Sequence, residues 1–192
     1  MEDLGALVEV LKRGGVVACP TETWLGLLAD ASNERAIHRV AELKGRPADM
    51  PIALLLPGTG SIGAVSLDLP PAAEALIEAH WPGPLTILLR ARPGLDARLV
   101  KDGKVGVRVP GPSPAAELTQ AFGRPLTATS ANLSGQPPVR SVDELPAALA
   151  AGLDAIVSGV SPGGAPSTLV DATETPMRIL RAGAIDIEAT AL

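Results

Sequence analysis

Residues 4–17 read LGALVEVLKRGGVV, and this stretch sets a pattern that continues along the chain. Its apolar residues recur at the three- and four-residue spacing of a helix with one buried face. They are Leu4, Leu7, Val8 and Leu11. Gly14 and Gly15 then indicate the end of the helix, and the β-branched pair Val16 and Val17 favours a strand. The stretch therefore predicts a helix, a tight turn and a strand in immediate succession.

Helical and strand-like segments keep alternating after this point. A polar loop starts at Pro20, and Ser32 or Asn33 is a suitable N-cap for a helix whose apolar positions run from Ala36 to Leu43. Gly45 and Pro47 end it. Apolar runs typical of strands follow at 52–56, 85–89, 105–109, 126–129, 155–157 and 169–170. This order predicts an α/β fold in which helices flank a mixed, twisted sheet, and the length of 192 residues suits a single domain over residues 1–192.

Charge is unevenly distributed along the chain. The formal net charge of -5 argues against broad binding to polyanions, which needs many lysines and arginines. Residues 90–108 nevertheless contain six basic and two acidic residues. We expect this segment to contribute to a basic concave cleft for a small anion, with a solvated basic hairpin without ligand as an alternative. An RNA-binding module is a further alternative, although aromatic residues that could stack on bases make up only 2% of the chain.

The composition favours a soluble protein of a reducing compartment. The longest apolar runs, such as Ile52 to Leu56, are far shorter than a bilayer requires. Glu2 and Asp3 stand where a signal peptide carries Lys or Arg. Cys19 has no second cysteine with which to form a disulfide. We therefore expect a cytoplasmic location and no membrane partner.

Familiar nucleotide and metal motifs are poorly supported. Residues 58–63 spell G-x-G-x-x-G, but the dinucleotide motif requires a substantial helix next, and Pro70 and Pro71 interrupt the chain within a few residues. A glycine-rich turn explains this stretch better. No P-loop sequence occurs. His38 and His80 fall on separate predicted helices without cysteine partners, so we predict no protein metal site.

Three polar clusters are candidates for ligand binding. Residues 20–26 place hydroxyls and a carboxylate at the carboxyl end of a predicted strand, the usual ligand side of an α/β sheet. Lys44 and Arg46 would direct two cations toward the same point, which suits binding of a phosphate chain. Cations that only complement the dipole at a helix C-terminus are an alternative interpretation of the same residues. Residues 127–135 gather hydroxyls, an amide and backbone N–H groups that suit an anion, although an ordinary Ser/Asn turn has this composition too.

Together with further motifs in the same order, these clusters resemble the YrdC family of threonylcarbamoyl-AMP synthases over nearly the whole chain. The motifs are Pro20-Thr21-Glu22-Thr23, Lys44-x-Arg46, Trp81-Pro82-Gly83-Pro84-Leu85-Thr86, Val107-Arg108-Val109-Pro110, Ser130-Ala131-Asn132-Leu133-Ser134-Gly135, Ser167-Thr168-Leu169-Val170-Asp171 and Leu180-Arg181-Ala182-Gly183. Each is weak alone, but so many in register are specific. The resemblance implies a YrdC-like fold and, because the chain ends soon after Arg181, the family's short form.

The resemblance implies a nucleotidyltransferase that uses ATP to make L-threonylcarbamoyl-AMP. In that reaction the amine of L-threonine captures bicarbonate or CO2, and the carbamate attacks the α-phosphate of ATP with release of pyrophosphate. By the same resemblance, Lys44, Arg46, Ser130 and Asn132 would be the catalytic residues, and Arg181 would join them in binding the nucleotide. Mg²⁺ would arrive with ATP rather than on a dedicated protein site.

The threonine pocket is also assigned by the resemblance. It would consist of Thr23, Arg108, the backbone of Ala128 and Ser167, with Arg108 pairing to the amino-acid carboxylate. In the family, the adenylate passes to a protein complex that modifies adenosine 37 of tRNA. The resemblance therefore implies a handover to such a complex, with weak or no direct tRNA binding by this chain.

The chain departs from the family's usual residues at four positions. They are Leu25, Met50, Leu55 and Pro138. Family members commonly have tyrosine at the position of Leu25, often asparagine at or near that of Met50, frequently histidine at or near that of Leu55, and often serine at that of Pro138. These changes replace polar side chains with apolar ones. They leave open a divergent paralogue that acts on another amine or carbamoyl compound.

Overall fold

The computed structural model describes residues 3–187. The α-helices are α1 (Leu4–Lys12), α2 (Glu34–Lys44), α3 (Pro71–His80), α4 (Pro114–Phe122) and α5 (Ala147–Ala150), and the 3₁₀ helices are η1 (Thr59–Ala64) and η2 (Val142–Glu144). The strands are β1 (Val17–Pro20), β2 (Leu25–Leu28), β3 (Ala53–Leu55), β4 (Leu85–Arg90), β5 (Val100–Lys101), β6 (Lys104–Arg108), β7 (Leu126–Ser130), β8 (Ala155–Ile156), β9 (Thr168–Asp171) and β10 (Arg178–Arg181). Within the described part of the chain, none of the helices is long and apolar enough to span a bilayer.

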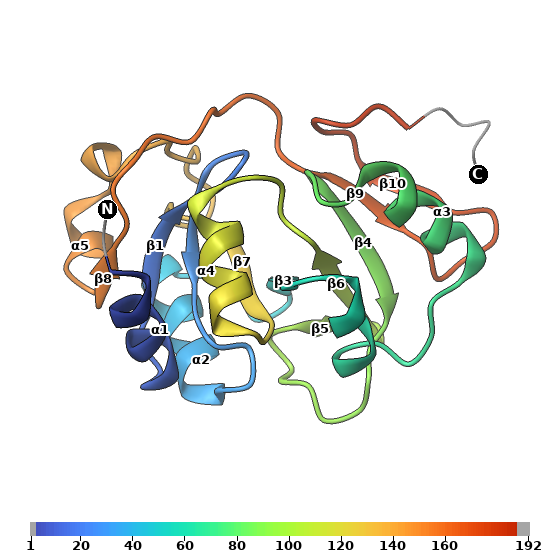
Figure 1. Cartoon of the computed structure of the whole chain (residues 1–192), viewed down its shortest axis with the longest axis horizontal. Coiled ribbons are helices and arrows are strands. Elements are labelled where there is room, and N and C mark those ends of the chain that lie inside the picture. The colour runs from blue at the N-terminus through green and yellow to red at the C-terminus, as the bar shows by residue number, and fades with distance from the viewer. Residues whose placement is uncertain (1–2, 188–192) are drawn as a thin grey trace.

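All ten strands belong to one mixed sheet (Figure 1). Their order is β10-β9-β4-β6-β3-β7-β2-β1-β8, and β5 pairs with β6 outside this path. The pairs β1–β8, β3–β6 and β4–β9 are parallel, whereas pairs such as β1–β2, β2–β7 and β4–β6 are antiparallel. The predicted α/β fold with a mixed sheet is thereby confirmed.

The two faces of the sheet carry different core clusters. Successive strand residues point to opposite faces, so Leu27 belongs to the larger cluster and Leu28 to the smaller one. Helices α2 and α3 cover the larger cluster, to which they contribute Ile37 and Leu76. Helices α1 and α4 cover the smaller one. Figure 1 views the molecule from the side of α1 and α4, which lie over the half of the sheet formed by β1, β2 and β7.

Helix ends follow the predicted capping chemistry. Asn33 is the N-cap of α2, because its Oδ1 accepts a hydrogen bond from the N–H of Ala36 at 3.2 Å. Gly45 ends this helix with a left-handed φ of 55°, which a residue without Cβ adopts easily. The helix end matters for the site, because it fixes where Lys44 and Arg46 leave α2.

Several segments differ from the prediction. Residues 25–28 were expected in a polar loop, but they form β2, which is buried throughout and pairs with both β1 and β7. Strands β5 and β10 were not predicted at all, since the first has two residues and the second is exposed along its length. The proline pair does not interrupt a helix but begins one, with Pro71 at the first turn of α3.

Candidate functional site

A row of small side chains crosses the middle of the sheet on the face that carries α1 and α4. Ala128 of β7 pairs with Ala53 of β3. A Cβ placed on Gly106 of β6 would lie 3.3 Å from Ala53 Cβ and 3.4 Å from Thr86 Cγ2, so these residues share one face. Ala53 and Ala128 are half-buried. Part of this face, at Ala53 and Ala128, is therefore accessible to solvent.

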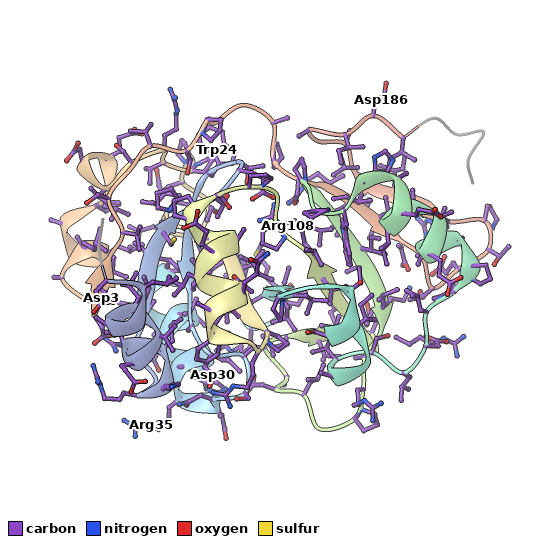
Figure 2. The ribbon with its side chains drawn as sticks, viewed as in Figure 1. Asp3, Trp24, Asp30, Arg35, Arg108 and Asp186 are labelled. Atoms are coloured by element: carbon purple, nitrogen blue, oxygen red, sulfur yellow. The ribbon has the colours of Figure 1, made fainter. Side chains whose placement is uncertain are left out.

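Strand alternation places the predicted polar residues on this same face. Arg108 follows Gly106 by two residues on β6, and Ser130 follows Ala128 by two residues on β7. Figure 2 shows Arg108 near the middle of the molecule, between the half of the sheet behind α4 and strands β4 and β9. This face thus carries a guanidinium from one strand and a hydroxyl from another.

Lys44 joins this border from the end of α2. Its Nζ donates to the backbone oxygen of Asn132 at 2.7 Å, to Asn132 Oδ1 at 3.1 Å and to the backbone oxygen of Ser130. The Ser130 hydroxyl donates to the same Asn132 Oδ1. Lys44 is only 2% exposed, and burial, followed by the nearby charge of Arg46, lowers the pKa of its amine to about 7. Three of the predicted site residues therefore form one hydrogen-bonded group.

Arg46 lies beside this group but is engaged with its own loop. Its Nε donates to the backbone oxygen of Met50 at 2.9 Å, and its Nη2 donates to the backbone oxygen of Pro51 at 2.8 Å. Partial burial lowers the pKa of the Arg46 guanidinium, which stays charged. The side chain thus shapes residues 47–51 while its charge remains near Lys44.

A second group surrounds Arg108. Its Nη1 lies 3.0 Å from Glu22 Oε1, and both side chains are deeply buried. Burial lowers the pKa of Arg108; the carboxylate of Glu22 opposes this shift, and the positive charge of Arg181 adds to it. Within the part of the chain that the structure describes, both oxygens of Glu22 and Arg108 Nε lack a hydrogen-bond partner. The contact is therefore an ion pair without the alignment of a hydrogen bond.

Arg181 and Ser167 complete this second group. Arg181 Nη2 donates to Ser167 Oγ at 3.0 Å and to the backbone oxygen of Ser167 at 2.8 Å. Ser167 Oγ is also 2.9 Å from Thr86 Oγ1. Antiparallel pairing of β9 and β10 brings the arginine to the serine. Ser167 thereby connects the face of β4 with the C-terminal segment.

The loop between β1 and β2 connects the two groups. It contains Thr21, Glu22 and Thr23, and the hydroxyls of Thr21 and Thr23 are 3.1 Å apart. At one end, Glu22 meets Arg108. At the other end, Gly26 of β2 pairs with Ser130 of β7. The loop thus meets the Arg108 group through Glu22 and leads into the strand that pairs with Ser130 of the Lys44 group.

Sequence reasoning gave no role to Glu22 or Thr86, although both lie in quoted motifs. Glu22 lies opposite Arg108 through a loop contact and Thr86 lies near Ser167 through the pairing of β4 with β9, and the sequence shows neither relationship. Lys104, another cation of the segment 90–108, has partners of its own. Lys104 Nζ lies 2.6 Å from Asp171 and 3.0 Å from Glu174, and these carboxylates raise the pKa of its amine. Of that basic segment, Arg108 is the member placed in the candidate site.

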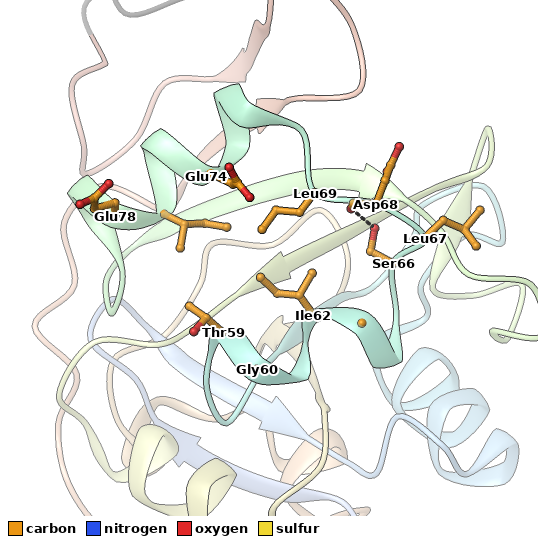
Figure 3. Close-up of a pocket in the computed structure, with 11 residues that line it drawn as sticks. Thr59, Gly60, Ile62, Ser66, Leu67, Asp68, Leu69, Glu74 and Glu78 are labelled. Carbon is orange, nitrogen blue, oxygen red and sulfur yellow. Dashed lines mark hydrogen bonds between the residues drawn. The ribbon is translucent and has the colours of Figure 1, made fainter.

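Two hollows in the surface lie elsewhere. The first, of about 540 Å³, lies between η1 and α3 and has Asp68, Glu74 and Glu78 in its lining (Figure 3). It includes part of the G-x-G-x-x-G stretch, and three carboxylates would repel a pyrophosphate, so the rejection of the dinucleotide motif is supported. The second, of about 360 Å³, has Arg35 and Arg39 in its lining. None of the predicted site residues lines either hollow.

Comparisons with known proteins agree on one family. The sequence pattern of the Sua5/YciO/YrdC family, described as telomere recombination, matches residues 9–183. A threonylcarbamoyl-AMP synthase of Stenotrophomonas maltophilia is 39% identical over 163 residues, which cover 83% of this chain and 88% of that protein. A threonylcarbamoyl-AMP synthase of Pyrococcus abyssi is 35% identical over 93% of this chain, but this chain spans about half (53%) of its length.

A solved structure gives the same result. The crystal structure of P. abyssi Sua5 complexed with L-threonine superposes with a TM-score of 0.89 at 33% sequence identity. The match covers 96% of this chain and 55% of that one.

The four departures from the usual family residues have different surroundings. Leu25 is fully buried in the larger core cluster, on the face opposite to Gly26 and Ser130. Leu55 is buried in the smaller cluster beneath α4. Met50 is 45% exposed, and its contact with Arg46 uses a backbone oxygen. Pro138 is half-buried. Leu25 and Leu55 therefore add to the packed core.

Proposed function

Because this chain belongs to the Sua5/YciO/YrdC family, we propose that it makes L-threonylcarbamoyl-AMP from L-threonine, bicarbonate or CO2, and ATP, with release of pyrophosphate. The enzyme class is a nucleotidyltransferase. The observation that carries the proposal is that one loop, between β1 and β2, contacts Arg108 through Glu22 and leads to Gly26, which pairs with Ser130 of the Lys44–Ser130–Asn132 group. An amino acid bound next to ATP requires one cation for its carboxylate and further cations for the phosphates.

The reaction needs positioning and charge neutralisation more than acid–base chemistry. The threonine amine attacks carbon dioxide and loses a proton, which gives a carbamate. A carbamate oxygen then attacks the α-phosphorus of ATP, and the bond to the β-phosphate oxygen breaks. Charge on the departing pyrophosphate and on the α-phosphate must be neutralised as it shifts. The site offers cations, hydroxyls and backbone donors for this purpose.

The proposal gives each predicted residue a role. Arg108 binds the threonine carboxylate, while Thr23, the backbone of Ala128 and Ser167 surround the rest of the amino acid. Lys44 and Arg46 neutralise the triphosphate. Ser130 and Asn132 orient the phosphate or ribose region, and Arg181 contacts the nucleotide. In this proposal, the basic concave cleft that the sequence predicts would lie between the Lys44 group and the Arg108 group.

Lys44 must exchange partners when ATP binds. Its amine donates hydrogen bonds to oxygens of Ser130 and Asn132. A phosphate anion is a stronger acceptor for an ammonium group than a carbonyl oxygen is. We infer that the triphosphate draws Lys44 toward it and so couples the loop of residues 130–132 to nucleotide binding.

Mg²⁺, partner and location belong to the same proposal. Glu22, the carboxylate of the Arg108 group, is already paired with Arg108, so the residues present fit a Mg²⁺ ion that the triphosphate brings with it. When bound, that ion would neutralise phosphate charge. The unstable adenylate would pass to a protein complex that modifies adenosine 37 of tRNA, and the protein would act in the cytoplasm.

One assay tests the proposed reaction. Purified protein is incubated with ATP, Mg²⁺, bicarbonate and L-threonine, and pyrophosphate release is measured. We expect release that depends on threonine and on bicarbonate. Unchanged release without threonine would refute the substrate, and release with another amine alone would identify a divergent paralogue. Salt-sensitive tRNA binding without ATP turnover would favour the RNA-binding alternative.

A further inference from the structure

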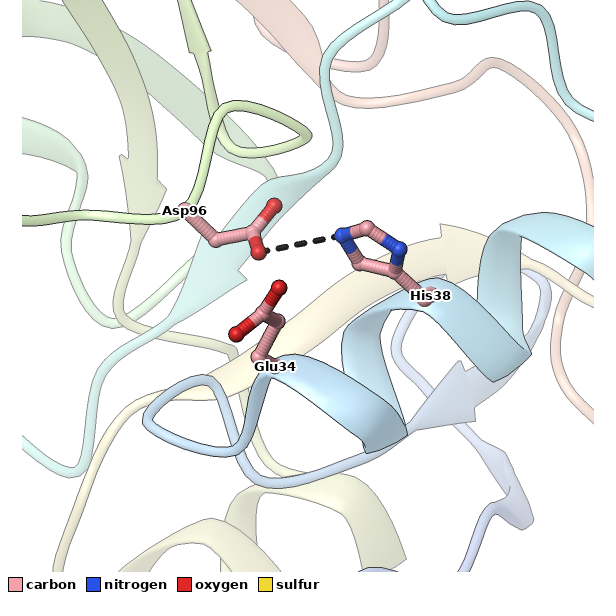
Figure 4. Close-up of side chains that lie close together, drawn as sticks. All are labelled: Glu34, His38 and Asp96. Carbon is pink, nitrogen blue, oxygen red and sulfur yellow. Dashed lines mark hydrogen bonds and ion pairs between the residues drawn. The ribbon is translucent and has the colours of Figure 1, made fainter.

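Three side chains outside the candidate site bring their polar atoms together on the surface of α2. Glu34 and His38 are one turn apart on this helix, and Asp96 comes from the segment between β4 and β5 (Figure 4). One donor atom from each residue lies within 4.8 Å of the other two. Sequence reasoning predicted no metal site because the two histidines are far apart. It considered neither carboxylate as a partner for a single histidine.

The spacing of two of these atoms already suits a metal ion. His38 Nε2 lies 3.2 Å from Asp96 Oδ2. In a tetrahedral site with bonds of about 2.0–2.1 Å, neighbouring ligand atoms are about 3.3 Å apart. Glu34 is exposed and can close the remaining distance by a change of rotamer. The three ligands would occupy one side of the ion and leave the other side to water.

Asp96 is held in place for this role. Its Oδ1 accepts a hydrogen bond from the backbone N–H of Arg98 at 2.7 Å, which directs Oδ2 toward His38. Partners of this kind orient metal ligands in known sites. The side chain of Asp96 is 12% exposed and that of His38 is 45% exposed, so an ion can enter from solvent.

The donor set selects the kind of metal. One imidazole and two carboxylates favour Zn²⁺ and other late divalent transition metals, whereas Mg²⁺ prefers oxygen ligands and water. Two carboxylates also balance the charge of a divalent ion. We propose that Glu34, His38 and Asp96 bind one Zn²⁺-like ion per chain, separate from any Mg²⁺ that accompanies ATP.

The position of this site gives it a structural consequence. Binding would tie the segment that carries Asp96 to the first half of α2. The same segment contacts the residues after the other end of α2, because Arg98 Nη1 donates to the backbone oxygen of Arg46 at 3.2 Å, and the N–H of Ile52 donates to the backbone oxygen of Arg98 at 2.7 Å. The bound ion would therefore stabilise the surroundings of Arg46. This last step rests on the proposed function of Arg46, whereas metal binding does not.

Metal binding can be tested without any assay of activity. The chelator-treated full-length chain is titrated with ZnCl2 or MgCl2 by calorimetry, and its melting temperature is measured in parallel. We expect one Zn²⁺ per chain and a higher melting temperature with Zn²⁺ but not with Mg²⁺. His38→Gln should weaken Zn²⁺ binding by at least about tenfold. His80→Gln, which changes the histidine on α3, is the matched control and should bind as the parent does.

Two outcomes would overturn the proposal. One is the absence of Zn²⁺ binding to the parent chain. The other is Zn²⁺ binding that His38→Gln and His80→Gln weaken equally, because the ion would then be bound elsewhere. Should His38→Gln fail to fold, Asp96→Asn serves in its place, and unweakened Zn²⁺ binding by that variant also refutes the site. Co²⁺ adds a spectroscopic check, since visible absorption of the bound ion should disappear in the same variants.

Discussion

The Arg108 guanidinium and the Glu22 carboxylate form a 3.0 Å ion pair in which the two side chains are 8% and 11% exposed. Both carboxylate oxygens and Arg108 Nε lack hydrogen-bond partners among residues 3–187. Buried charged groups normally use their hydrogen-bonding capacity fully. The pair therefore balances charge but leaves donors and acceptors unused. We expect a ligand carboxylate to compete with Glu22 for Arg108.

Glu22→Gln should make folding more dependent on threonine. The substitution leaves a buried guanidinium without its counter-charge, so the free energy of unfolding should fall by about 3 kcal/mol. A threonine carboxylate would restore the charge balance, and added threonine should stabilise this variant more than the parent. Urea unfolding with and without threonine measures both effects. Glu9→Gln, which breaks an exposed pair with Lys12, is the control and should leave stability nearly unchanged, because solvent screens exposed pairs. Equal stabilisation by threonine of Glu22→Gln and parent would contradict the competition.

Binding of ATP should take up a proton at Lys44. The free amine has its pKa lowered to about 7, so at pH 8.5 it is mostly neutral. Phosphate anions favour the charged form and raise the pKa, so the amine gains a proton on binding. Calorimetry in buffers of different ionisation enthalpy should show uptake approaching one proton at pH 8.5 and little at pH 6, where the amine is already charged. The uptake should be lost in Lys44→Met and kept in Lys12→Met. Proton release at pH 8.5 would contradict this prediction.

Arg46→Ala should remove most activity while the fold stays intact. The side chain contributes two hydrogen bonds to the loop of residues 47–51. This loop lies outside the two core clusters, and only the next residue, Ile52, belongs to one of them. We expect pyrophosphate release to fall on the order of a hundredfold, as when one preorganised donor to a transition state is lost. Arg46→Lys keeps the charge but not the planar fork, and should recover only part of the activity. Circular dichroism checks the fold of Arg46→Ala. Loss of the folded spectrum in this variant would identify Arg46 as a structural residue.

Ser130 and Ser134 provide a matched pair of substitutions in one loop. The Ser130 hydroxyl donates to Asn132 Oδ1, whereas Ser134 Oγ is buried without a hydrogen-bond partner in the described part of the chain. Ser130→Ala should therefore lower pyrophosphate release by about five- to tenfold, since a lost hydrogen bond costs about 1–1.5 kcal/mol. Ser134→Ala should leave release nearly unchanged. A similar loss in both variants would mean that the loop needs hydroxyls only for its shape.

Local sequence spacing predicted much of this fold. The periodicity of Leu4, Leu7 and Leu11 identified α1, and Asn33 and Gly45 marked the ends of α2. Hydrogen bonds between neighbours in sequence decide such features, so they can be read without knowing the fold. Strand β2 was missed because Leu25–Leu28 is a short apolar run without alternation. Its identity as a strand depends on the two strands that pair with it.

In the candidate site too, some features can be read from the sequence and others depend on the tertiary structure. The types of its residues, such as the cations Lys44 and Arg46 and the polar loop after Ser130, are visible in the sequence as short motifs. Their partners are not, because contacts such as Lys44 with Asn132, or Glu22 with Arg108, join residues that are distant along the chain. Tertiary packing brings them together, and burial then lowers the pKa of Lys44, while the oxygens of Glu22 have no hydrogen-bond partner among the residues that the structure describes. The sequence alone thus determined which chemical groups are present, and tertiary structure decided their neighbours and charge states, because hydrogen bonding and desolvation depend on distances in space.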